Sequence, residues 1–372
     1  MSEVDLLKIV ISGGGTGGHI YPGIAIANKI KQLHPKSQIV FVGVKNRIEA
    51  KIVPKERYPL KTIYIKSLPR KMGLKTIGFL FSLFVGLIQS IIFLLRYKPK
   101  VVVGTGGYVS YPVVYAAHLL KIPTLIQEQN SYPGIATKKL ASKVDEIHLA
   151  FEEAARYLSK AHPEKFRITG NPIRLPSGRI DRAKALEQFG LEKNKRTLLL
   201  FGGSQGAAPL NEALLNALPE LSPNIQILWQ TGELDYERVR TESKKFQHRM
   251  VIQPFFFNMA DAYAATDLAL CRAGAITIAE LVQAGVPAIF VPLPHAAEGH
   301  QEKNARVLVA ANASAMILQQ DLTGLRLKAA IEELIFDDVK LTEMRRNLQK
   351  FHYPDAAGQI AQRVIELAGQ KV

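Results

Sequence analysis

Three glycine-rich turns constrain the fold of this chain most, because each follows a short apolar run and precedes a segment with a helical pattern. The runs and their turns are Lys8–Ser12 before Gly13–His19, Thr197–Phe201 before Gly202–Gly206, and Asp267–Leu270 before Cys271–Gly274. A helix that starts directly after such a turn offers free N–H groups and a partial positive charge, which bind phosphate. Glycine also lets the backbone approach a ligand closely. The turns near the start of each half therefore predict two nucleotide-binding α/β domains that face each other.

Strand-like runs alternate with helical patterns along the whole chain, which is typical of doubly wound parallel sheets. The strands predicted for the first sheet are Ile9–Ser12, Ile39–Val42, Thr62–Ile65, Val101–Val103, Thr124–Gln127, Glu146–Ala150 and Arg167–Thr169. Those predicted for the second are Leu198–Phe201, Ile225–Gln230, Met250–Gln253, Leu268–Leu270, Ala288–Val291 and Ala315–Leu318. Helical patterns at Gly23–Leu33 and Tyr111–Leu120 separate strands of the first set.

The strand pattern restarts after Gly170-Asn171-Pro172, and this restart predicts two domains. We expect an N-terminal domain over residues 1–172 and a C-terminal domain over residues 173–352. A last helical pattern, Ala356–Leu367, follows Tyr353-Pro354. It is expected to return to the first domain, so that residues 353–372 complete it. A length of 372 residues also fits two domains better than one core.

The charge balance favours anionic partners. Lys and Arg number 48 against 32 Asp and Glu, giving a formal net charge of +16. Phosphorylated substrates, an anionic membrane surface and nucleic acid all suit such a chain. Nucleic acid is disfavoured, because the chain has no aromatic RNA-binding motif or zinc pattern. The single cysteine, Cys271, rules out an intrachain disulfide and suits a reducing cytoplasm. The charged N-terminus does not resemble a signal peptide.

The run from Thr76 to Leu95 holds 20 residues without a charge, enough to span a bilayer. Spanning would separate the first glycine turn from Gly104–Tyr108 and break a βαβ unit. We therefore favour a helix whose outer face lies in the lipid interface; a plain core helix ranks next and a true span last. The cations on either side are Lys66, Arg70, Lys71, Lys75, Arg96, Lys98 and Lys100. Each adds about 1 kcal/mol of attraction to acidic lipids near the surface.

The first turn, Gly13-x-Gly15-x-x-Gly18, also matches the dinucleotide fingerprint. That fingerprint needs a carboxylate at the end of the second strand to bind the ribose hydroxyls. The strand here ends Val42-Gly43-Val44-Lys45 and has none. An NADP-dependent oxidoreductase that reads a 2′-phosphate with Lys45 or Arg47 stays as an alternative.

Taken together, the motifs resemble those of the glycosyltransferase family that completes lipid II in bacterial peptidoglycan synthesis. The matching stretches are GGGTGGHIYPGIA (13–25), VVGTGGYVSYPV (102–113), IQEQNSYPG (126–134), GNPIR (170–174), FGGSQGA (201–207), CRAGAITIAEL (271–281), GVPAIFVPLP (285–294) and HQEKNA (300–305). The resemblance implies a GT-B fold, with two Rossmann-like domains facing across a cleft. It implies an inverting transfer of GlcNAc from UDP-GlcNAc to the C4 hydroxyl of MurNAc in lipid I, without metal or cofactor. The enzyme would be peripheral on the cytoplasmic face of the bacterial plasma membrane, with other cell-wall synthesis proteins as possible partners.

The resemblance assigns donor binding mainly to the C-terminal half. Glu280 would bind the ribose hydroxyls, since two carboxylate oxygens suit a vicinal diol. Gln301 would contact the donor sugar, and backbone groups at Phe256 would read uracil. The other implied substrate-binding residues are Arg174, Ser204, Gln205, Arg272, Gly274, Ala275, Ile276, Thr277, Ile278 and Ala279. Two roles stay open for Arg272: neutralising phosphate and bracing the cleft.

The resemblance assigns acceptor binding and catalysis to the N-terminal loops. Implied substrate contacts there are Thr16, Gly17, Gly18 and Asn130, and the acceptor loops contain Gly15, Gly106, Gly107 and Tyr108. The attacking hydroxyl needs a base, and His19 is the first candidate because histidine is easily tuned toward neutral pH. A structural hydrogen bond that orients the glycine turn is its competing role. Glu128 is the second candidate base.

Other classes of function stay open beside this one. Another UDP-sugar enzyme of the same fold, such as a UDP-GlcNAc 2-epimerase or a diacylglycerol glycosyltransferase, is the main alternative. A non-catalytic scaffold at the membrane surface is a further one. One departure from the family is clear, because many members have two acidic residues where this chain has Glu298-Gly299 before His300-Gln301.

Overall fold

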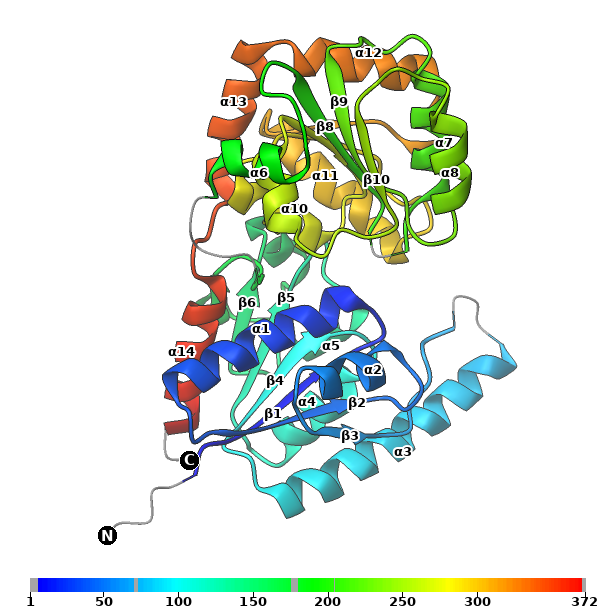
Figure 1. Cartoon of the computed structure of the whole chain (residues 1–372). Coiled ribbons are helices and arrows are strands. Elements are labelled where there is room, and N and C mark those ends of the chain that lie inside the picture. The colour runs from blue at the N-terminus through cyan, green and yellow to red at the C-terminus, as the bar shows by residue number, and fades with distance from the viewer. Residues whose placement is uncertain (1–5, 70–72, 175–179, 204, 370–372) are drawn as a thin grey trace. The chain divides into compact units, whose positions relative to one another are not determined.

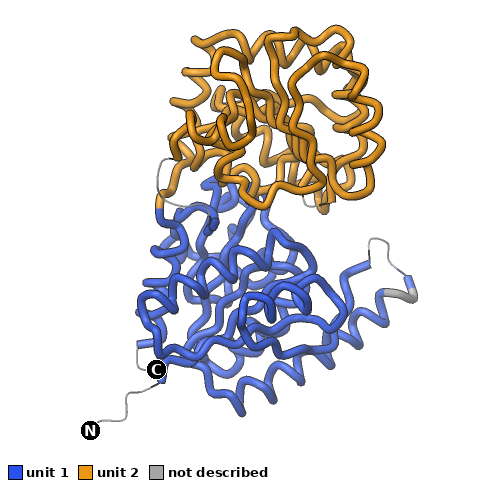
Figure 2. The backbone as a smooth tube through the Cα atoms, in the orientation of Figure 1, with its two compact units in different colours: residues 1–174, 355–372 blue, residues 175–354 orange. Residues whose placement is uncertain are grey.

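The computed structural model describes residues 6–69, 73–174, 180–203 and 205–369. The chain forms two compact units (Figures 1 and 2). Unit 1 comprises residues 1–174 and 355–372, and unit 2 comprises residues 175–354. Each unit is built around its own parallel sheet.

The sheet of unit 1 has seven parallel strands in the order β3-β2-β1-β4-β5-β6-β7. They are β1 (Lys8–Gly13), β2 (Gln38–Gly43), β3 (Leu60–Thr62), β4 (Val101–Gly106), β5 (Thr124–Glu128), β6 (Glu146–Leu149) and β7 (Phe166–Ile168). All seven predicted strands are present. β3 was expected over Thr62–Ile65, but its pairing ends where Thr62 meets Gly43, the last residue of β2.

Helices cover both faces of this sheet, because successive strand residues point to opposite sides. Ile9 and Ile11 of β1 pack in one cluster with α1 (Gly17–Leu33) and α14 (Ala356–Gly369). Val10 packs in the other cluster with α3 (Leu74–Tyr97), α4 (Ser110–Leu119) and α5 (Ile135–Leu140). The short α2 (Ile48–Lys55) follows β2.

Helix α1 begins earlier than its pattern predicts. It starts at Gly17 rather than Gly23 and continues through Pro22. A proline inside a helix removes one N–H donor, which is why the sequence favoured a later start. Here the bond that Pro22 cannot make would end on Gly18, in the first turn, and the proline itself is buried. The helix therefore starts directly at the glycine turn.

Helix α14 brings the end of the chain back to the first sheet, beside α1 (Figure 1). Ile360, Ala361 and Val364 enter the cluster formed by β1 and α1. Arg363 adds an ion pair with Glu146 of β6, and both carboxylate oxygens of Glu146 accept hydrogen bonds from it. The Oε2 atom of the same carboxylate also contacts the Nε2 atom of the buried His148 at 3.2 Å.

The sheet of unit 2 has six parallel strands in the order β10-β9-β8-β11-β12-β13. They are β8 (Arg196–Phe201), β9 (Ile225–Gln230), β10 (Met250–Gln253), β11 (Leu268–Cys271), β12 (Ala288–Phe290) and β13 (Ala315–Met316). Its helices are α6 (Arg182–Gln188), α7 (Ala208–Ala217), α8 (Tyr236–Ser243), α9 (Met259–Ala265), α10 (Ala275–Ala284), α11 (His300–Ala310), α12 (Gly324–Ile335) and α13 (Asp338–Leu348). All six predicted strands are present. Two doubly wound parallel sheets confirm the predicted fold class.

Candidate active site

Both sheets reverse their strand order at one point, and the glycine turns lie there. The reversal falls between β1 and β4 in unit 1 and between β8 and β11 in unit 2. Ligands of open α/β sheets bind beyond the carboxyl ends of the strands at such a reversal. The turns after β1 and β4 therefore form one candidate site, and the turns after β8 and β11 form another.

In unit 1 the two turns contact each other through their backbones. The Gly14 N–H donates to the Gly106 carbonyl at 3.4 Å. A Cβ on Gly107 would lie 2.2 Å from the Gly14 carbonyl oxygen, and Gly106 and Gly107 have φ values of 98° and 78°. Any other residue at Gly107 would push the turns apart. The ring of Tyr108 lies over Gly15, and burial raises the pKa of its phenol.

A buried carboxylate that sequence reasoning missed supports the first turn. Glu49, in the first turn of α2, is 0% exposed. One of its oxygens accepts the Val44 N–H and the other accepts the Gly15 N–H, each at 3.1 Å. The Gly15 N–H is therefore already satisfied, whereas no hydrogen bond from the described residues occupies the N–H groups of Thr16, Gly17 and Gly18 at the start of α1. Glu49 lies six residues beyond Gly43, the last residue of β2.

His19, in the first turn of α1, contacts the loop after β5. Its Nδ1 atom lies 2.9 Å from Oε1 of Gln129. Thr105 of β4 donates its hydroxyl to the His19 carbonyl at 2.7 Å. A Cβ on Gly106 would lie 2.7 Å from the same Nδ1 atom, so this glycine makes room for the ring.

Glu128, the second candidate base, is buried among hydrogen-bond donors. One oxygen accepts from the backbone N–H and the side-chain amide of Asn130. The other accepts from the Gly134 N–H and the Thr137 hydroxyl. Four donors occupy the four lone-pair positions of a carboxylate. Glu128 therefore holds the turn over 130–134, including Asn130, in place.

Arg174 is engaged within unit 1. Its guanidinium pairs with Glu56 at 2.8 Å and lies 5.2 Å from the ring centre of Tyr21. This pair is partly exposed, so water screens it and an anion can compete for the cation. Tyr21, one turn after Gly17, was not singled out in the sequence.

In unit 2 the turn after β11 leads directly into α10. Gly274 is the N-cap, with an extended backbone at φ −66° and ψ 140°, and its carbonyl accepts the Ile278 N–H. The N–H groups of Ile276 and Thr277 in the first turn point toward the helix start, where no intrahelical acceptor exists. The side chain of Ile278 is buried in the core, whereas that of Ala279 is partly exposed. Cys271, just before the turn, is buried, and burial raises the pKa of its thiol.

Glu280 lies on α10 and is held by a residue that the sequence did not suggest. The hydroxyl of Tyr263, on α9, donates to its Oε2 atom at 2.9 Å. Burial raises the pKa of Glu280 to about 7, although the Tyr263 hydrogen bond lowers it. Tyr263 is itself buried and packs its ring against Phe201 of β8. Among the described residues, no other hydrogen bond occupies Glu280, so Oε1 is available to a ligand.

Arg272 braces the turn after β11 through buried contacts. Its guanidinium donates to the carbonyls of Val291 and Pro292 at 3.0 and 3.3 Å, and to Oε1 of Gln319 at 2.7 Å. Burial lowers its pKa to about 10. The next residue, Leu293, donates its N–H to Oε1 of Gln301 at 2.9 Å. Of the two roles left open for Arg272, these contacts favour bracing of the protein over binding of phosphate. The segment that Arg272 holds, Val291–Leu293, in turn contacts the side chain of Gln301.

The turn after β8 is held by Gln230, a residue outside the predicted set. Its amide donates to the Gly203 carbonyl at 3.1 Å and accepts the Phe256 N–H at 2.9 Å. The Phe256 side chain is buried against Phe189. The Phe256 N–H is therefore engaged within unit 2. Gln205 is exposed in this turn, and Ser204 lies outside the described residues.

The segment that departs from the family motif before Gln301 has a left-handed backbone. Glu298 and Gly299 both have left-handed backbones, with φ values of 53° and 66°. Glycine adopts this conformation without steric cost, and here Gly299 is the N-cap of α11. Over the described ranges, no three His, Cys, Asp or Glu side chains gather in a metal-binding cluster.

Comparison with known proteins agrees with this arrangement. Residues 9–149 match the glycosyltransferase family 28 N-terminal domain, and residues 197–360 match the family 28 C-terminal domain. The chain is 43% identical over 356 residues to the UDP-N-acetylglucosamine–N-acetylmuramyl-(pentapeptide) pyrophosphoryl-undecaprenol N-acetylglucosamine transferase of Bacillus pumilus, covering 94% of this chain and 96% of that protein. It is 38% identical over 364 residues to the transferase of the same description from Bacillus subtilis, covering 97% and 99%.

Solved structures show the same fold. The crystal structure of Acinetobacter baumannii MurG matches with a TM-score of 0.79 and 28% identity, over 96% of this chain and 99% of that one. A UDP-GlcNAc 2-epimerase from Neisseria meningitidis, bound to UDP-GlcNAc, matches with a TM-score of 0.65 at 12% identity, over 96% and 100%. That second likeness shows the fold alone. Two doubly wound sheets with glycine turns at their reversal points define the GT-B fold class. The chain belongs to glycosyltransferase family 28.

Proposed function

We propose that this protein transfers GlcNAc from UDP-GlcNAc to the C4 hydroxyl of MurNAc in lipid I and so forms lipid II. Relatives that span nearly its whole length are described as UDP-N-acetylglucosamine–N-acetylmuramyl-(pentapeptide) pyrophosphoryl-undecaprenol N-acetylglucosamine transferases. The observation that carries the donor assignment is the start of α10. Gly274 is the N-cap of this helix, and the Glu280 carboxylate, further along it, accepts a 2.9 Å hydrogen bond from a buried phenol. The N–H groups at the helix start suit a diphosphate, and the carboxylate suits a ribose diol.

The geometry supports one division of roles within this proposal. His19 is the base that takes the proton of the attacking hydroxyl, since the Glu128 carboxylate already has four donors. The hydroxyl attacks the anomeric carbon opposite the leaving UDP, which inverts the configuration there. The N–H groups at the start of α10 stabilise the charge that develops on the diphosphate, without metal. Gly17 and Gly18 bind the diphosphate of the lipid acceptor.

Transfer of labelled GlcNAc to a short-chain lipid I analogue, with EDTA present, tests this function. We expect turnover by the wild type and a loss of at least tenfold in kcat/KM for Glu280→Gln. Glu237→Gln, an exposed carboxylate on α8, is the matched control and should behave as wild type. Conversion of UDP-GlcNAc to its 2-epimer without transfer would instead identify an epimerase, and a requirement for metal would overturn the metal-free mechanism.

We also propose that unit 1 docks on the cytoplasmic face of the plasma membrane through α3. Residues Thr76–Tyr97 are long and apolar enough to cross a bilayer by length and composition. Yet one side of α3, with Leu83, Leu87 and Leu94, packs in the core with α4. A span would remove that side from the core, so a peripheral position fits better.

The other side of α3 carries an exposed apolar stripe at helical spacing. Its members are Ile77, Leu80, Phe81, Phe84, Ile88, Ile92 and Leu95, with Phe81 and Phe84 64% and 61% exposed. Lys66, Arg96 and Lys98 are exposed at its two ends, and such cations attract anionic lipids. Arg70, Lys71 and the side chain of Lys75 lie outside the described residues.

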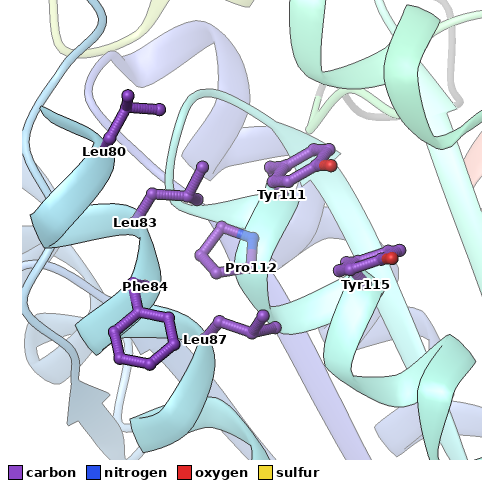
Figure 3. Close-up of a pocket in the computed structure, with 7 residues that line it drawn as sticks. All are labelled: Leu80, Leu83, Phe84, Leu87, Tyr111, Pro112 and Tyr115. Atoms are coloured by element: carbon purple, nitrogen blue, oxygen red, sulfur yellow. The ribbon is translucent and has the colours of Figure 1, made fainter. Parts of the chain in front are cut away.

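A shallow apolar groove adjoins the stripe between α3 and α4 (Figure 3). Its volume is about 230 Å³, and its lining is Leu80, Leu83, Phe84, Leu87, Tyr111, Pro112 and Tyr115. The Lys143 ammonium lies 5.5 Å from the ring centre of Tyr115, at one side of this lining. Apolar side chains bordered by a cation suit the boundary between headgroups and acyl chains. Contacts with other cell-wall synthesis proteins stay a prediction.

A further inference from the structure

Gln129 occupies a buried position between the two turns of unit 1. It follows β5 and is 2% exposed. Its amide nitrogen donates to the backbone carbonyls of Thr105 and Gln127, at 2.9 and 3.1 Å, and to the side-chain oxygen of Gln127. Its amide oxygen faces Nδ1 of His19 at 2.9 Å.

These partners determine which end of the amide faces His19. The carbonyl oxygens of Thr105 and Gln127 only accept hydrogen bonds, so they require the NH₂ end of Gln129. A reversed amide would place its oxygen against these two backbone carbonyl oxygens and lose both of the hydrogen bonds to them. The end toward the imidazole is therefore the oxygen, which is also only an acceptor.

An acceptor at 2.9 Å requires a hydrogen on Nδ1 of His19. A neutral imidazole carries one N–H, so its lone pair then lies on Nε2. No hydrogen bond from a described residue occupies Nε2. Room for the ring comes from Gly106, where a Cβ would lie 2.7 Å from Nδ1, and Thr105 fixes the His19 carbonyl.

We propose that Gln129 is a positioning residue that holds His19 in the Nδ1–H tautomer, so that Nε2 accepts the proton of the attacking hydroxyl. The role as base rests on the proposed function. In the step, the O–H bond of the acceptor breaks and its proton moves to Nε2. The oxygen bonds to the anomeric carbon, and the bond from that carbon to the diphosphate breaks, so UDP leaves with the electron pair. The imidazolium then releases its proton to solvent.

Long-range ¹H–¹⁵N correlation spectra of the full-length protein, labelled at its nine histidines, test the tautomer without any turnover. The His19 signals are assigned by their loss in His19→Gln. We expect Nδ1 to show the shift of a protonated nitrogen and Nε2 that of an unprotonated one. The opposite pattern would overturn the proposal, whether or not the protein transfers GlcNAc.

The kinetic test compares Gln129→Met with Gln226→Met. Both remove a fully or almost fully buried amide; that of Gln226 bonds to Glu192 and Thr197 in unit 2, and only Gln129 contacts His19. We expect Gln129→Met to lower kcat by about 10- to 100-fold with KM for both substrates within twofold, and to give His19 signals of mixed tautomers. Gln226→Met should keep the wild-type tautomer and most of kcat.

Two results separate this inference from the proposed function. An unchanged kcat in Gln129→Met, beside a large loss in His19→Ala, would overturn the role of Gln129 while His19 stayed the base. A wild type with the expected tautomer but no GlcNAc transfer would contradict the proposed function instead, and with it the proton transfer, leaving only the hydrogen-bond assignment.

Discussion

At the residue scale, two opposing effects set the pKa of the Glu280 carboxyl group. Burial raises its pKa to about 7, and the phenol of Tyr263 acts in the other direction by stabilising the charged form. A ribose diol donates hydrogen bonds, so it needs the ionised carboxylate. Donor binding should therefore depend on pH within the physiological range.

We predict that UDP affinity falls as pH is lowered from 8 to 6. The ionised fraction of Glu280 drops about tenfold for each pH unit well below its pKa, and the dissociation constant should rise accordingly. Calorimetric titration with UDP at several pH values measures this. Glu280→Gln should bind weakly with no such slope, and an equally steep slope in that variant would assign it to another group.

We predict that Tyr263→Phe moves the midpoint of this pH dependence upward. Without the phenol donor at 2.9 Å, burial alone acts on Glu280, and its pKa rises further. UDP binding should then weaken already near pH 8. The same titrations detect the shift, and an unmoved midpoint would show that the phenol does not stabilise the charged carboxylate.

We predict that Arg272→Met destabilises unit 2 by about 2 kcal/mol, because buried acceptors at Val291, Pro292 and Gln319 lose their donor. The KM for UDP-GlcNAc should rise more than kcat falls, since the segment that Arg272 holds contacts Gln301. Denaturant unfolding and steady-state kinetics measure both. Arg326→Met, on the surface of α12, should change neither; an equal effect there would contradict the bracing role.

At the scale of elements, α3 and α14 use apolar faces differently. Helix α14 buries its apolar face on the sheet and fixes it with Arg363. Helix α3 has a buried face and a second apolar face that is exposed. Burial of the second face by lipid is the expected reason for its composition.

We predict that Phe81→Ser with Phe84→Ser weakens binding to anionic vesicles by at least tenfold, because about 2 kcal/mol of apolar burial is lost per ring. Vesicle sedimentation measures this, and higher salt should weaken wild-type binding too. Leu325→Ser with Val339→Ser, two exposed apolar residues of unit 2, is the matched control. Equal loss in both pairs would mean that binding does not use α3.

We predict that Arg363→Met costs about 3 kcal/mol at neutral pH, because it leaves the Glu146 carboxylate buried with less charge compensation. Burial acts to raise the pKa of Glu146, but hydrogen bonds from His148 and Arg363 lower it to about 2. A lowered carboxyl pKa stabilises the fold above the unfolded value of 4.5, and this contribution is lost as pH falls toward 2. Unfolding curves should therefore converge for wild type and variant in acid. Arg240→Met removes an exposed ion pair with Glu237, and it should leave the free energy of unfolding unchanged.

Strands were well predicted because each is a short apolar run that follows a loop. The ends of elements were less certain: β3 ends where its partner strand ends, and α1 passes through Pro22. The supporting residues Glu49, Gln129 and Tyr263 escaped sequence reasoning, because each acts on a residue 17 to 110 positions away. Only the folded chain brings such pairs together.

At the scale of the whole molecule, the strand order explains why the glycine turns predicted the fold class and the place of the candidate sites. A parallel sheet that reverses its order leaves space at one point of its carboxyl edge, and both turns of each unit lie there. The glycine turns and the alternation of strand-like and helical runs together predicted the fold class. They did not predict the substrate, since an epimerase with a different activity shares the fold at 12% identity.

The single cysteine has a practical consequence for studying this enzyme. Cys271 is buried, and its thiol is held in the unreactive protonated form. Spin labels or fluorophores that react with thiols would therefore leave the natural chain unmodified. One cysteine introduced on the surface of each unit would carry a label pair against a blank background, and the distance between the labels could then be followed while nucleotide and lipid are added.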